Sequence, residues 1–309
     1  MYPILFEVFG IEFPAYFTFL TLGFALAILL ARRWARRRGL DFEAATDLGL
    51  YMLIAGVVGA RVLHVFVDGF FWDYVHLCAD PSKVEWRITH ARCVAENVGG
   101  VWDAARGICR PGHRDCFAWA KFWNGGLVYY GGFLGAAAYG MWFVRRHRLP
   151  FWKTVDMTGY TIVLGLVWGR IGCFMGGCCF GSPTEVAWGV RYGGWSPASE
   201  AQHDAGLLSR AAEPSLPVHP AQLYEAFGCI AIFFYLALWL EPRKRFDGHV
   251  FLSFVALYAS LRFVVEYFRA DMRGEVLGLS TSQLIGVGLL AAAAWGWRRL
   301  SDVKVPAAS

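Results

Sequence analysis

The chain has 309 residues, of which 57% are hydrophobic and 17% are charged, and it carries a formal net charge of +5. Soluble domains carry about 25% charged residues, so this composition excludes an ordinary soluble globular domain.

Seven mostly apolar runs are long enough to cross a hydrocarbon core, which takes roughly 20 residues. They lie at about 13–31, 47–67, 125–144, 154–176, 221–240, 250–268 and 282–297. The chain is therefore predicted to be an all-α integral membrane protein, with seven transmembrane helices that form a single transmembrane domain over residues 1–309.

Cations are concentrated between alternate runs. Fifteen of the 29 Lys and Arg lie in the short segments 32–46, 145–153 and 241–249 and after residue 297. Cytoplasmic loops are enriched in Lys and Arg, so the N-terminus is expected outside and the C-terminus in the cytoplasm. The opening "MYPILFEVFGIEFPAYF" lacks a basic region and a small-residue cleavage site, so no removable signal peptide is expected. The net charge is explained by this topology, and no nucleic-acid partner is expected.

Two long connections are predicted as periplasmic insertions, at about 73–122 and 182–218. The first holds Cys78, Cys93, Cys109 and Cys116. In an oxidising compartment these predict two disulfides, with three possible pairings. A zinc site is the alternative, but the sequence has no C-x₂-C pair there. The second insertion is rich in Ser, Pro, Ala and Gly, and is expected to form a partly ordered flap or crossing segment.

Ionisable residues inside the apolar runs are costly, at roughly 2.5–3.5 kcal/mol each, and normally face the interior of a bundle. By the predicted topology they all lie in the outer half, which indicates a polar chamber open toward the outer leaflet. They are Arg61, His64, Arg170, His219, Glu225, Arg262, Glu266 and Arg269.

The stretch "LRFVVEYFRAD" predicts that Arg262, Glu266 and Arg269 share one helical face, since they are four and three residues apart. One interpretation is a structural ladder of ion pairs. The other is that Arg262 and Arg170 bind an anion while Glu266 orients one of them. Two guanidinium groups suit a phosphodiester, and a phospholipid headgroup is the obvious one in an outer-leaflet chamber.

Two further motifs fit this chamber. In "WNGGLVYYGGFLG", Gly125-Gly126 and Gly131-Gly132 leave room for a headgroup or a re-entrant backbone to come close, although tight helix packing explains any one of these glycines nearly as well. In "HPAQLYE", Pro220 begins a helix. The polar residues of this motif are expected to line the same mouth, although His219 has helix entry as an alternative role; they are His219, Gln222, Tyr224 and Glu225.

These motifs carry a resemblance. The segments "GARVLHV", "GGLVYYGGFLG", "GRIGCFMGGCCFG", "HPAQLYE" and "LRFVVEYFR" occur in the order found in the prolipoprotein diacylglyceryl transferases, and the chain resembles that family outside the loop 73–122. The resemblance implies a multi-pass enzyme of the bacterial inner membrane that works without a cofactor. It would transfer diacylglyceryl from phosphatidylglycerol, a membrane lipid, to the lipobox cysteine thiol in a prolipoprotein signal peptide.

The resemblance also implies residue roles. Arg170 and Arg262 correspond to the essential arginines, Gly181 closes the signature, and Tyr16 and Asp156 fall at family positions. The sequence departs from the pattern G-R-x-G-N-F-x-N-G-E-x-x-G at Cys173, Gly176 and Cys178, and Tyr130 stands where the family has a histidine base.

The predicted catalytic residues are Arg170, Arg262, Tyr130 and Glu266, and no metal ligand is assigned. The predicted substrate-binding residues are Tyr16, Arg61, Gly131, Gly132, Gly181, His219, Gln222, Tyr224, Glu225 and Arg269.

Cys173, Cys178 and Cys179 allow three interpretations. They pack or pair oxidatively in place of the lost Asn and Glu, or one is a thiolate beside Arg170. In the third they bind a soft metal, although no histidine lies near them in the sequence. Two further functional classes stay open: a non-catalytic lipid- or lipoprotein-binding paralogue, and a thiol-redox membrane protein.

Overall fold

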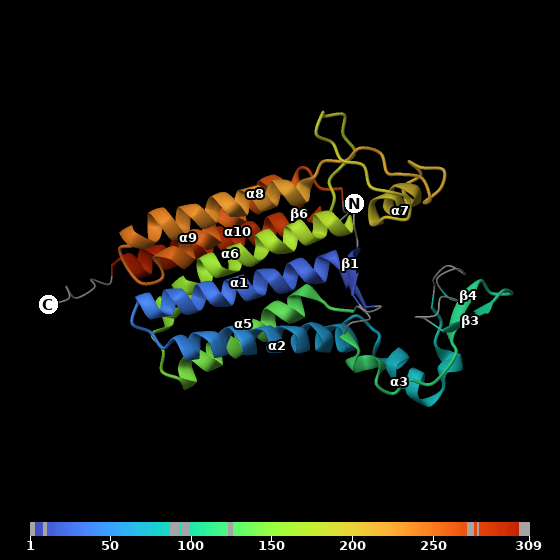
Figure 1. The fold of residues 1–309 in the computed structure, drawn as a ribbon, viewed down its shortest axis with the longest axis horizontal. Coiled ribbons are helices and arrows are strands. Elements are labelled where there is room, and N and C mark those ends of the chain that lie inside the picture. Colours follow the sequence, from blue (N-terminus) through green and yellow to red (C-terminus); the bar gives the residue numbers. More distant parts are fainter. Residues whose placement is uncertain are drawn as a thin grey trace. The chain divides into compact units, whose positions relative to one another are not determined.

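The computed structural model describes residues 4–8, 11–86, 93, 99–122, 126–270, 275–276 and 278–302 (Figure 1). The described chain is mostly helical. It forms two compact units, which are treated separately below: unit 1 is Met1–Thr46 with Leu149–Ser309, and unit 2 is Asp47–Arg148.

Each of the seven predicted apolar runs contains a helix. The nine α-helices of the described residues are α1 (Ala15–Arg37), α2 (Phe42–Val67), α3 (Phe71–Ala79), α5 (Tyr129–Arg146), α6 (Phe151–Gly176), α7 (Pro197–Asp204), α8 (Ala221–Phe234), α9 (His249–Glu266) and α10 (Thr281–Ser301). Five helices are long and apolar enough to cross a membrane: α1, α2, α6, α9, and α8 with its continuation to Arg243. The other two runs correspond to α5 and α10.

The described residues include three two-stranded antiparallel hairpins, one before α1 and two between helices. They are β1 (Ile4–Val8) with β2 (Ile11–Pro14), β3 (Gly100–Asp103) with β4 (Ile108–Pro111), and β5 (Glu275–Val276) with β6 (Leu279–Ser280). Helices span the apolar runs because a helix pairs its backbone N–H and C=O groups within itself, which a membrane core requires.

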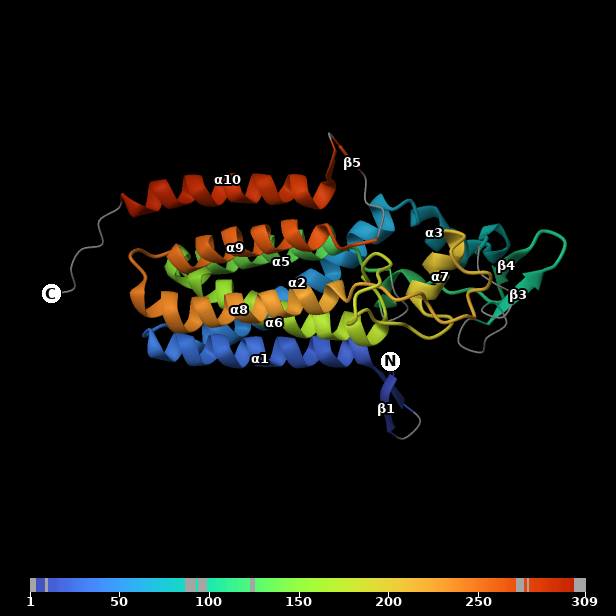
Figure 2. The same ribbon diagram turned by 90° about the horizontal axis from the view of Figure 1, so that it is seen from above.

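In unit 1, α6 is the central helix. It packs against α1, α8 and α9, and α10 packs against α9 (Figure 2). Small residues permit the close approaches. A Cβ atom at Gly172 would lie 3.2 Å from the Cα of Tyr16 on α1, and one at Gly159 would lie 3.3 Å from the Cα of Phe251 on α9.

A buried carboxylate joins α6 to the beginning of α9. Asp156 is fully buried, and its Oδ2 accepts hydrogen bonds from the backbone N of Gly248 at 3.0 Å and from Lys244 Nζ at 3.1 Å. Its Oδ1 accepts from the backbone N of Phe251 at 3.1 Å. The first N–H groups of a helix have no partner within it and favour a negative charge, so Asp156 caps α9 from a neighbouring helix.

The same end of unit 1 holds its cationic segments. Arg38, after α1, forms an ion pair with Glu241, after α8. Lys153 Nζ, near the beginning of α6, donates to the backbone O of Arg38 at 3.1 Å. These contacts place the basic segments predicted to be cytoplasmic together at one end of the unit 1 helices.

In unit 2, glycines bring α2 and α5 into contact. A Cβ at Gly131 would lie 2.3 Å from the carbonyl O of Gly59, and one at Gly135 would lie 2.4 Å from that of Ala55. The pairing of the loop cysteines is Cys78 with Cys116 and Cys93 with Cys109, which leaves none of them for the alternative zinc site.

The segment 182–218 is ordered and has a small core of its own. Tyr192, Ala198 and Val218 are buried there, with Phe180 and Val190 packed against them. Helix α7 begins with a capping box, in which Ser196 and Ser199 satisfy each other's backbone N–H groups. The predicted flap is therefore a folded element.

We expect Asp156→Ala to destabilise unit 1, because it leaves two N–H groups at the α9 terminus and the Lys244 ammonium without their acceptor. The free energy of unfolding should fall by about 3 kcal/mol. Thermal unfolding of the purified protein in detergent measures the change. Asp247→Ala is the matched control, since it removes the second, half-exposed carboxylate of Lys244 and should cost less than about 1 kcal/mol. Equal losses in the two variants would contradict the capping role.

Candidate functional site

A buried carboxylate at the beginning of α8 joins three helices. Glu225 is fully buried, and its Oε2 lies 3.0 Å from Nε of Arg170, near the end of α6. Its Oε1 accepts a hydrogen bond of 2.8 Å from the hydroxyl of Tyr258 on α9. A buried ion pair is stable only when its other polar atoms also have partners. Tyr258 therefore helps to hold Arg170 in place by satisfying the second oxygen atom of Glu225.

A second ion pair lies at the end of α9. Arg262 Nη2 is 2.7 Å from Glu266 Oε2, and both side chains are largely buried. The hydroxyl of Ser280, at the N-cap of α10, donates to Glu266 Oε1 at 2.8 Å. Among the described residues, the buried Nη1 of Arg262 has no hydrogen-bond partner. Nη2 also makes no hydrogen bond among these residues and is held by the ion pair with Glu266, so Nη1 is the nitrogen that neither interaction engages.

The two ion pairs belong to one charge cluster. The charge of Glu225 acts on Arg262 as well as on Arg170, and Arg269 and Glu266 also act on Arg262. The five groups comprise three cations and two anions, so the cluster has a net positive charge suited to an anionic ligand.

The expected helical face of three residues is wrong for Arg269. Helix α9 ends at Glu266, so only Arg262 and Glu266 share the face. The chain turns after Glu266, and the backbone of Arg269 forms a bridge with Gly181. The residues that would have extended α9 pair instead with the backbone of the segment that follows α6.

This segment, Gly181-Ser182, is a strap that joins the beginning of α8 to the end of α9. The N of Gly181 donates to the carbonyl O of His219 at 2.9 Å, and the N of Ser182 donates to that of Phe268 at 2.8 Å. A Cβ at Gly181 would lie 2.4 Å from the Phe268 O and 2.6 Å from the His219 Cβ. The position requires glycine because two chain segments approach its backbone.

The amide of Gln222 connects the strap region to the folded insertion. Its buried Nε2 donates to the carbonyl O of Cys178 at 2.6 Å and to the hydroxyl of Tyr192 at 3.0 Å. Burial raises the pKa of Tyr192 to about 12, so this phenol remains neutral. The hydrogen bonds of Gln222 therefore connect α8 to the chain that follows α6.

His219 and Tyr224 form a separate polar pair. His219 Nδ1 lies 3.1 Å from the hydroxyl of Tyr224, which also accepts a hydrogen bond of 2.7 Å from Trp188 Nε1. The polar side chains of the motif "HPAQLYE" thus have three separate roles: the pair of His219 and Tyr224, the hydrogen bonds of Gln222, and the ion pair of Glu225.

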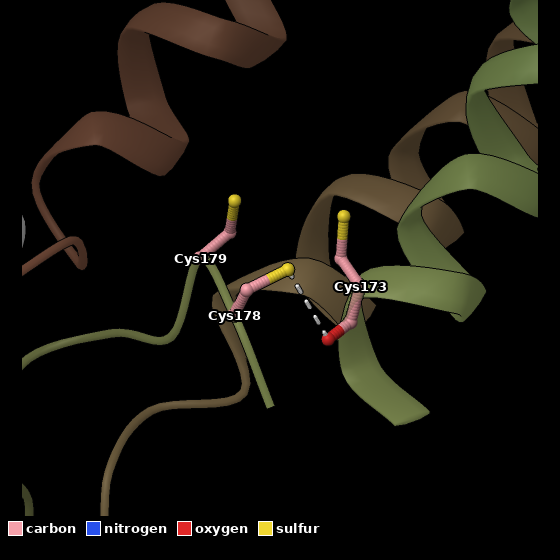
Figure 3. A group of neighbouring side chains, drawn as sticks. All are labelled: Cys173, Cys178 and Cys179. Atoms are coloured by element: carbon pink, nitrogen blue, oxygen red, sulfur yellow. Dashed lines mark hydrogen bonds between the residues drawn. The ribbon is translucent and has the colours of Figure 1, made fainter. Parts of the chain in front are cut away.

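Three thiols gather where α6 ends (Figure 3). The sulfur atoms of Cys173, Cys178 and Cys179 all lie within 4.8 Å of one another, and all three cysteines are free. Hydrogen bonds from Cys173 and Cys178 lower the pKa of Cys179 against the effect of burial, and the charge of Arg170 lowers it further. The thiols are thus next to the predicted anion site.

The other predicted residues belong to unit 2, apart from Tyr16 at the beginning of α1 in unit 1. The guanidinium of Arg61 donates to the backbone carbonyls of Trp119, Ala118 and Gly126, which fits a role in holding the chain before α5. Arg61 also lines an apolar cavity of about 1040 Å³ along α2 and α3.

The side chain of Tyr130 is about half exposed on the first turn of α5. Gly131 makes the close contact between α2 and α5 described above, which fits the packing alternative. Gly132 makes a looser contact, since its Cβ would lie 3.3 Å from the carbonyl O of Gly56.

Sequence reasoning missed three residues of the cluster. Tyr258 lies four residues before Arg262, so helical spacing could have placed it on the same face of α9. Ser280 begins the capping-box pattern S-x-x-Q that ends at Gln283, a recognisable signal for the start of α10. Tyr192 lies in the insertion, and no sequence pattern links it to Gln222.

Comparison with known proteins gives this geometry a context. The family model of the prolipoprotein diacylglyceryl transferases matches residues 3–90 and 112–299. The chain belongs to this family. The unmatched residues 91–111 include the β3–β4 hairpin and both cysteines of the Cys93–Cys109 disulfide. Residues 91–111 thus lie outside the part of the chain that the family model matches.

Several relatives carry the name phosphatidylglycerol–prolipoprotein diacylglyceryl transferase. The one from Clostridium tetani is 26% identical over 287 residues, which cover 93% of each chain. The one from Xanthomonas campestris pv. campestris is 36% identical over 212 residues, covering 61% of this chain and 68% of the relative. The one from Pseudoalteromonas atlantica is 27% identical, with 99% of this chain and 94% of the relative covered.

We expect Gly181→Ala to disrupt the strap, because its methyl group would overlap a backbone oxygen. The free energy of unfolding should fall by about 1–3 kcal/mol, as for other overpacked sites. Gly176→Ala, in the same signature, is the matched control, since a Cβ there meets no atom within 4 Å. Thermal unfolding in detergent compares the two, and a Gly181→Ala variant as stable as Gly176→Ala would contradict the strap.

Proposed function

We propose that this protein transfers the diacylglyceryl group of phosphatidylglycerol to the lipobox cysteine thiol of a prolipoprotein, at the outer face of the bacterial inner membrane. Membership of the family and the names of the relatives support the reaction. The observation that carries the proposal is the cluster of Arg170 and Arg262, in which two buried carboxylates hold the guanidinium groups and the Nη1 of Arg262 has no hydrogen-bond partner among the described residues.

The proposal includes seven transmembrane helices in a single transmembrane domain, with the N-terminus outside and the C-terminus in the cytoplasm. The distribution of charge within unit 1 supports this orientation. The basic segments around Arg38 and Lys244 lie at the Asp156 end of the helices. Arg170 and Glu225 lie near the opposite ends of α6 and α8, where the insertion 182–218 begins and returns. By the positive-inside rule, this distribution supports our proposal that the arginine cluster faces the outer leaflet.

The first step of the mechanism is binding of the lipid phosphate. In this proposal Arg170 and Arg262 bind the phosphate oxygens, and Arg262 does so through Nη1. Glu225 pairs with the Nε of Arg170, so the ion pair fixes the Arg170 side chain through the nitrogen nearest its aliphatic stem. Planar guanidinium groups bind phosphate through paired hydrogen bonds, and Glu266 with Ser280 orients the second one.

The second step is substitution at carbon. The acceptor thiolate attacks C3 of the diacylglyceryl group, a C–S bond forms, and the C3–O bond breaks. The electron pair of that bond leaves with glycerol phosphate, and the arginines stabilise the negative charge that develops there. The thiol proton passes to a base, for which we propose the phenolate form of Tyr130, which becomes the neutral phenol. The other predicted substrate contacts, including Tyr16 and Arg269, remain part of the proposal.

A thiol-redox function is the second candidate, and the proximity of Cys173, Cys178 and Cys179 favours it. Transfer of radiolabelled diacylglyceryl to a lipobox peptide, in purified membranes supplied with phosphatidylglycerol, separates the two. A redox protein or a non-catalytic lipid-binding paralogue would leave the peptide unmodified.

We expect Arg170→Lys and Arg262→Lys each to reduce turnover about 100-fold, because an ammonium group cannot reproduce the paired hydrogen bonds of guanidinium. The lipobox-peptide assay measures the change at equal amounts of inserted protein. Arg210→Lys, at an exposed position in the insertion, is the control and should retain the wild-type rate. Wild-type rates in both cluster variants would remove the phosphate-binding role.

Tyr130 provides a test of the proposed base. Tyr130→Phe should abolish transfer because it removes the hydroxyl, whereas Tyr130→His should retain it, since histidine is a base near neutral pH. Tyr129→Phe, at the neighbouring exposed tyrosine, should have no effect. If Tyr130→Phe turns over like the wild type, another group accepts the proton.

A further inference from the structure

The thiols of Cys173, Cys178 and Cys179 are arranged as a set of ligands. Cys173 lies on the last turns of α6, and Cys178 and Cys179 follow the helix end at Gly176. The three sulfur atoms lie within 4.8 Å of one another. Three thiolates around one metal ion, at about 2.3 Å each, lie about 4 Å apart, so sub-ångström shifts of the side chains would complete such a site.

The backbone is bent to achieve this arrangement. Gly177 adopts a left-handed conformation with φ 72°, and so does Cys179 with φ 59°, although it is not a glycine. Non-glycine residues rarely adopt this conformation, and such strain is concentrated at functional sites. Cys178 Sγ also lies 3.8 Å from the carbonyl O of Cys173, and Gln222 holds the carbonyl of Cys178 from α8. The turn is therefore held in a shape that brings the three sulfur atoms together.

The number and kind of ligands select the ion. Soft thiolate ligands favour Cu(I), zinc and iron–sulfur clusters. Structural zinc is almost always four-coordinate, whereas the candidate ligand group among the described residues consists of the three cysteines. Three sulfur ligands suit a soft cation that accepts three-coordination, and Cu(I) is such an ion.

The charged groups around the three thiols suit a Cu(I)–thiolate complex. Cu(I) bound to three thiolates has a net charge of −2, which is costly in a largely buried position unless cations are near. The charge of Arg170 acts on Cys179, and the Arg269 side chain acts on it through a hydrogen bond. Two guanidinium groups therefore lie where they would compensate the complex.

We propose that Cys173, Cys178 and Cys179 form a three-thiolate binding site for Cu(I) at the end of α6. Binding displaces whatever protons the three cysteines still hold, these protons pass to solvent, and no oxidation state changes. The site goes beyond the proposed transfer of diacylglyceryl, and its test does not depend on that activity.

The test is Cu(I) titration of the full-length protein, purified in detergent, kept reduced and free of oxygen, in competition with a chromogenic Cu(I) chelator. We expect one tightly bound Cu(I) per chain, and X-ray absorption should show three sulfur ligands at about 2.3 Å. Each of Cys173→Ser, Cys178→Ser and Cys179→Ser should weaken binding at least about tenfold, since serine is nearly isosteric but offers no thiolate.

Two controls isolate the cluster. Cys229→Ser removes the buried free cysteine of α8 and should bind Cu(I) like the wild type. The triple serine variant retains Cys229 and the four disulfide cysteines, so it measures any binding at those positions. Thermal unfolding without metal checks that each variant is folded, and Cu(I) should raise the unfolding temperature of the wild type but not of the triple variant.

Three results would overturn the proposal. The first is that the triple variant binds Cu(I) as tightly as the wild type. The second is that the wild type binds Zn²⁺ at the cluster in preference to Cu(I). The third is a thiol count by maleimide mass-tagging, without reductant, that finds two of the three cluster cysteines in a disulfide. Loss of Cu(I) binding with intact transferase activity, or the reverse, distinguishes failure of this site from failure of the proposed function.

Discussion

Glu225 is fully buried among apolar helices, and the arrangement of this end of unit 1 follows from the cost of a carboxylate in that position. Its two oxygen atoms are engaged by Arg170 from α6 and Tyr258 from α9, so three helices meet at one charged group. Removing either partner would leave a buried charge unsatisfied. The ion pair thus positions the guanidinium that we propose to bind phosphate, and it specifies how α6, α8 and α9 meet.

The strap extends this arrangement to the backbone. Gly181 and Ser182 donate their N–H groups to the carbonyls of His219 and Phe268, which tie the beginning of α8 to the end of α9. These hydrogen bonds also explain why Arg269 leaves the helical face. Arg269 is thereby placed beside the thiols, where its side chain acts on Cys179 through a hydrogen bond. A local competition for backbone partners therefore determines which side chains reach the site.

The three thiols connect the family scaffold to what is particular to this chain. Gln222, on α8, holds the turn that follows α6 through the carbonyl of Cys178. The turn has two left-handed residues, Gly177 and Cys179, and the second is unusual for a side chain other than glycine. The backbone of this turn is thus held in place while three side chains there present sulfur.

The sequence by itself determined the class of protein, the positions of the helices and the family. Hydropathy over about 20 residues decides membrane insertion locally, so each of the seven runs could be read from composition alone. The i,i+4 spacing likewise predicted the pair of Arg262 and Glu266, since both residues lie within one helix. The sequence also identified Arg170 and Glu225 as costly charges, but it could not pair them, because they are 55 positions apart and on different helices. Only the tertiary structure decided that pairing and supplied the partners Tyr258 and Ser280. It also decided that α9 ends before Arg269, which of the three disulfide pairings forms, and that three sulfur atoms lie together. Each of these depends on contacts between segments distant in the chain, where packing and the burial of charge, and not local propensity, select the partner.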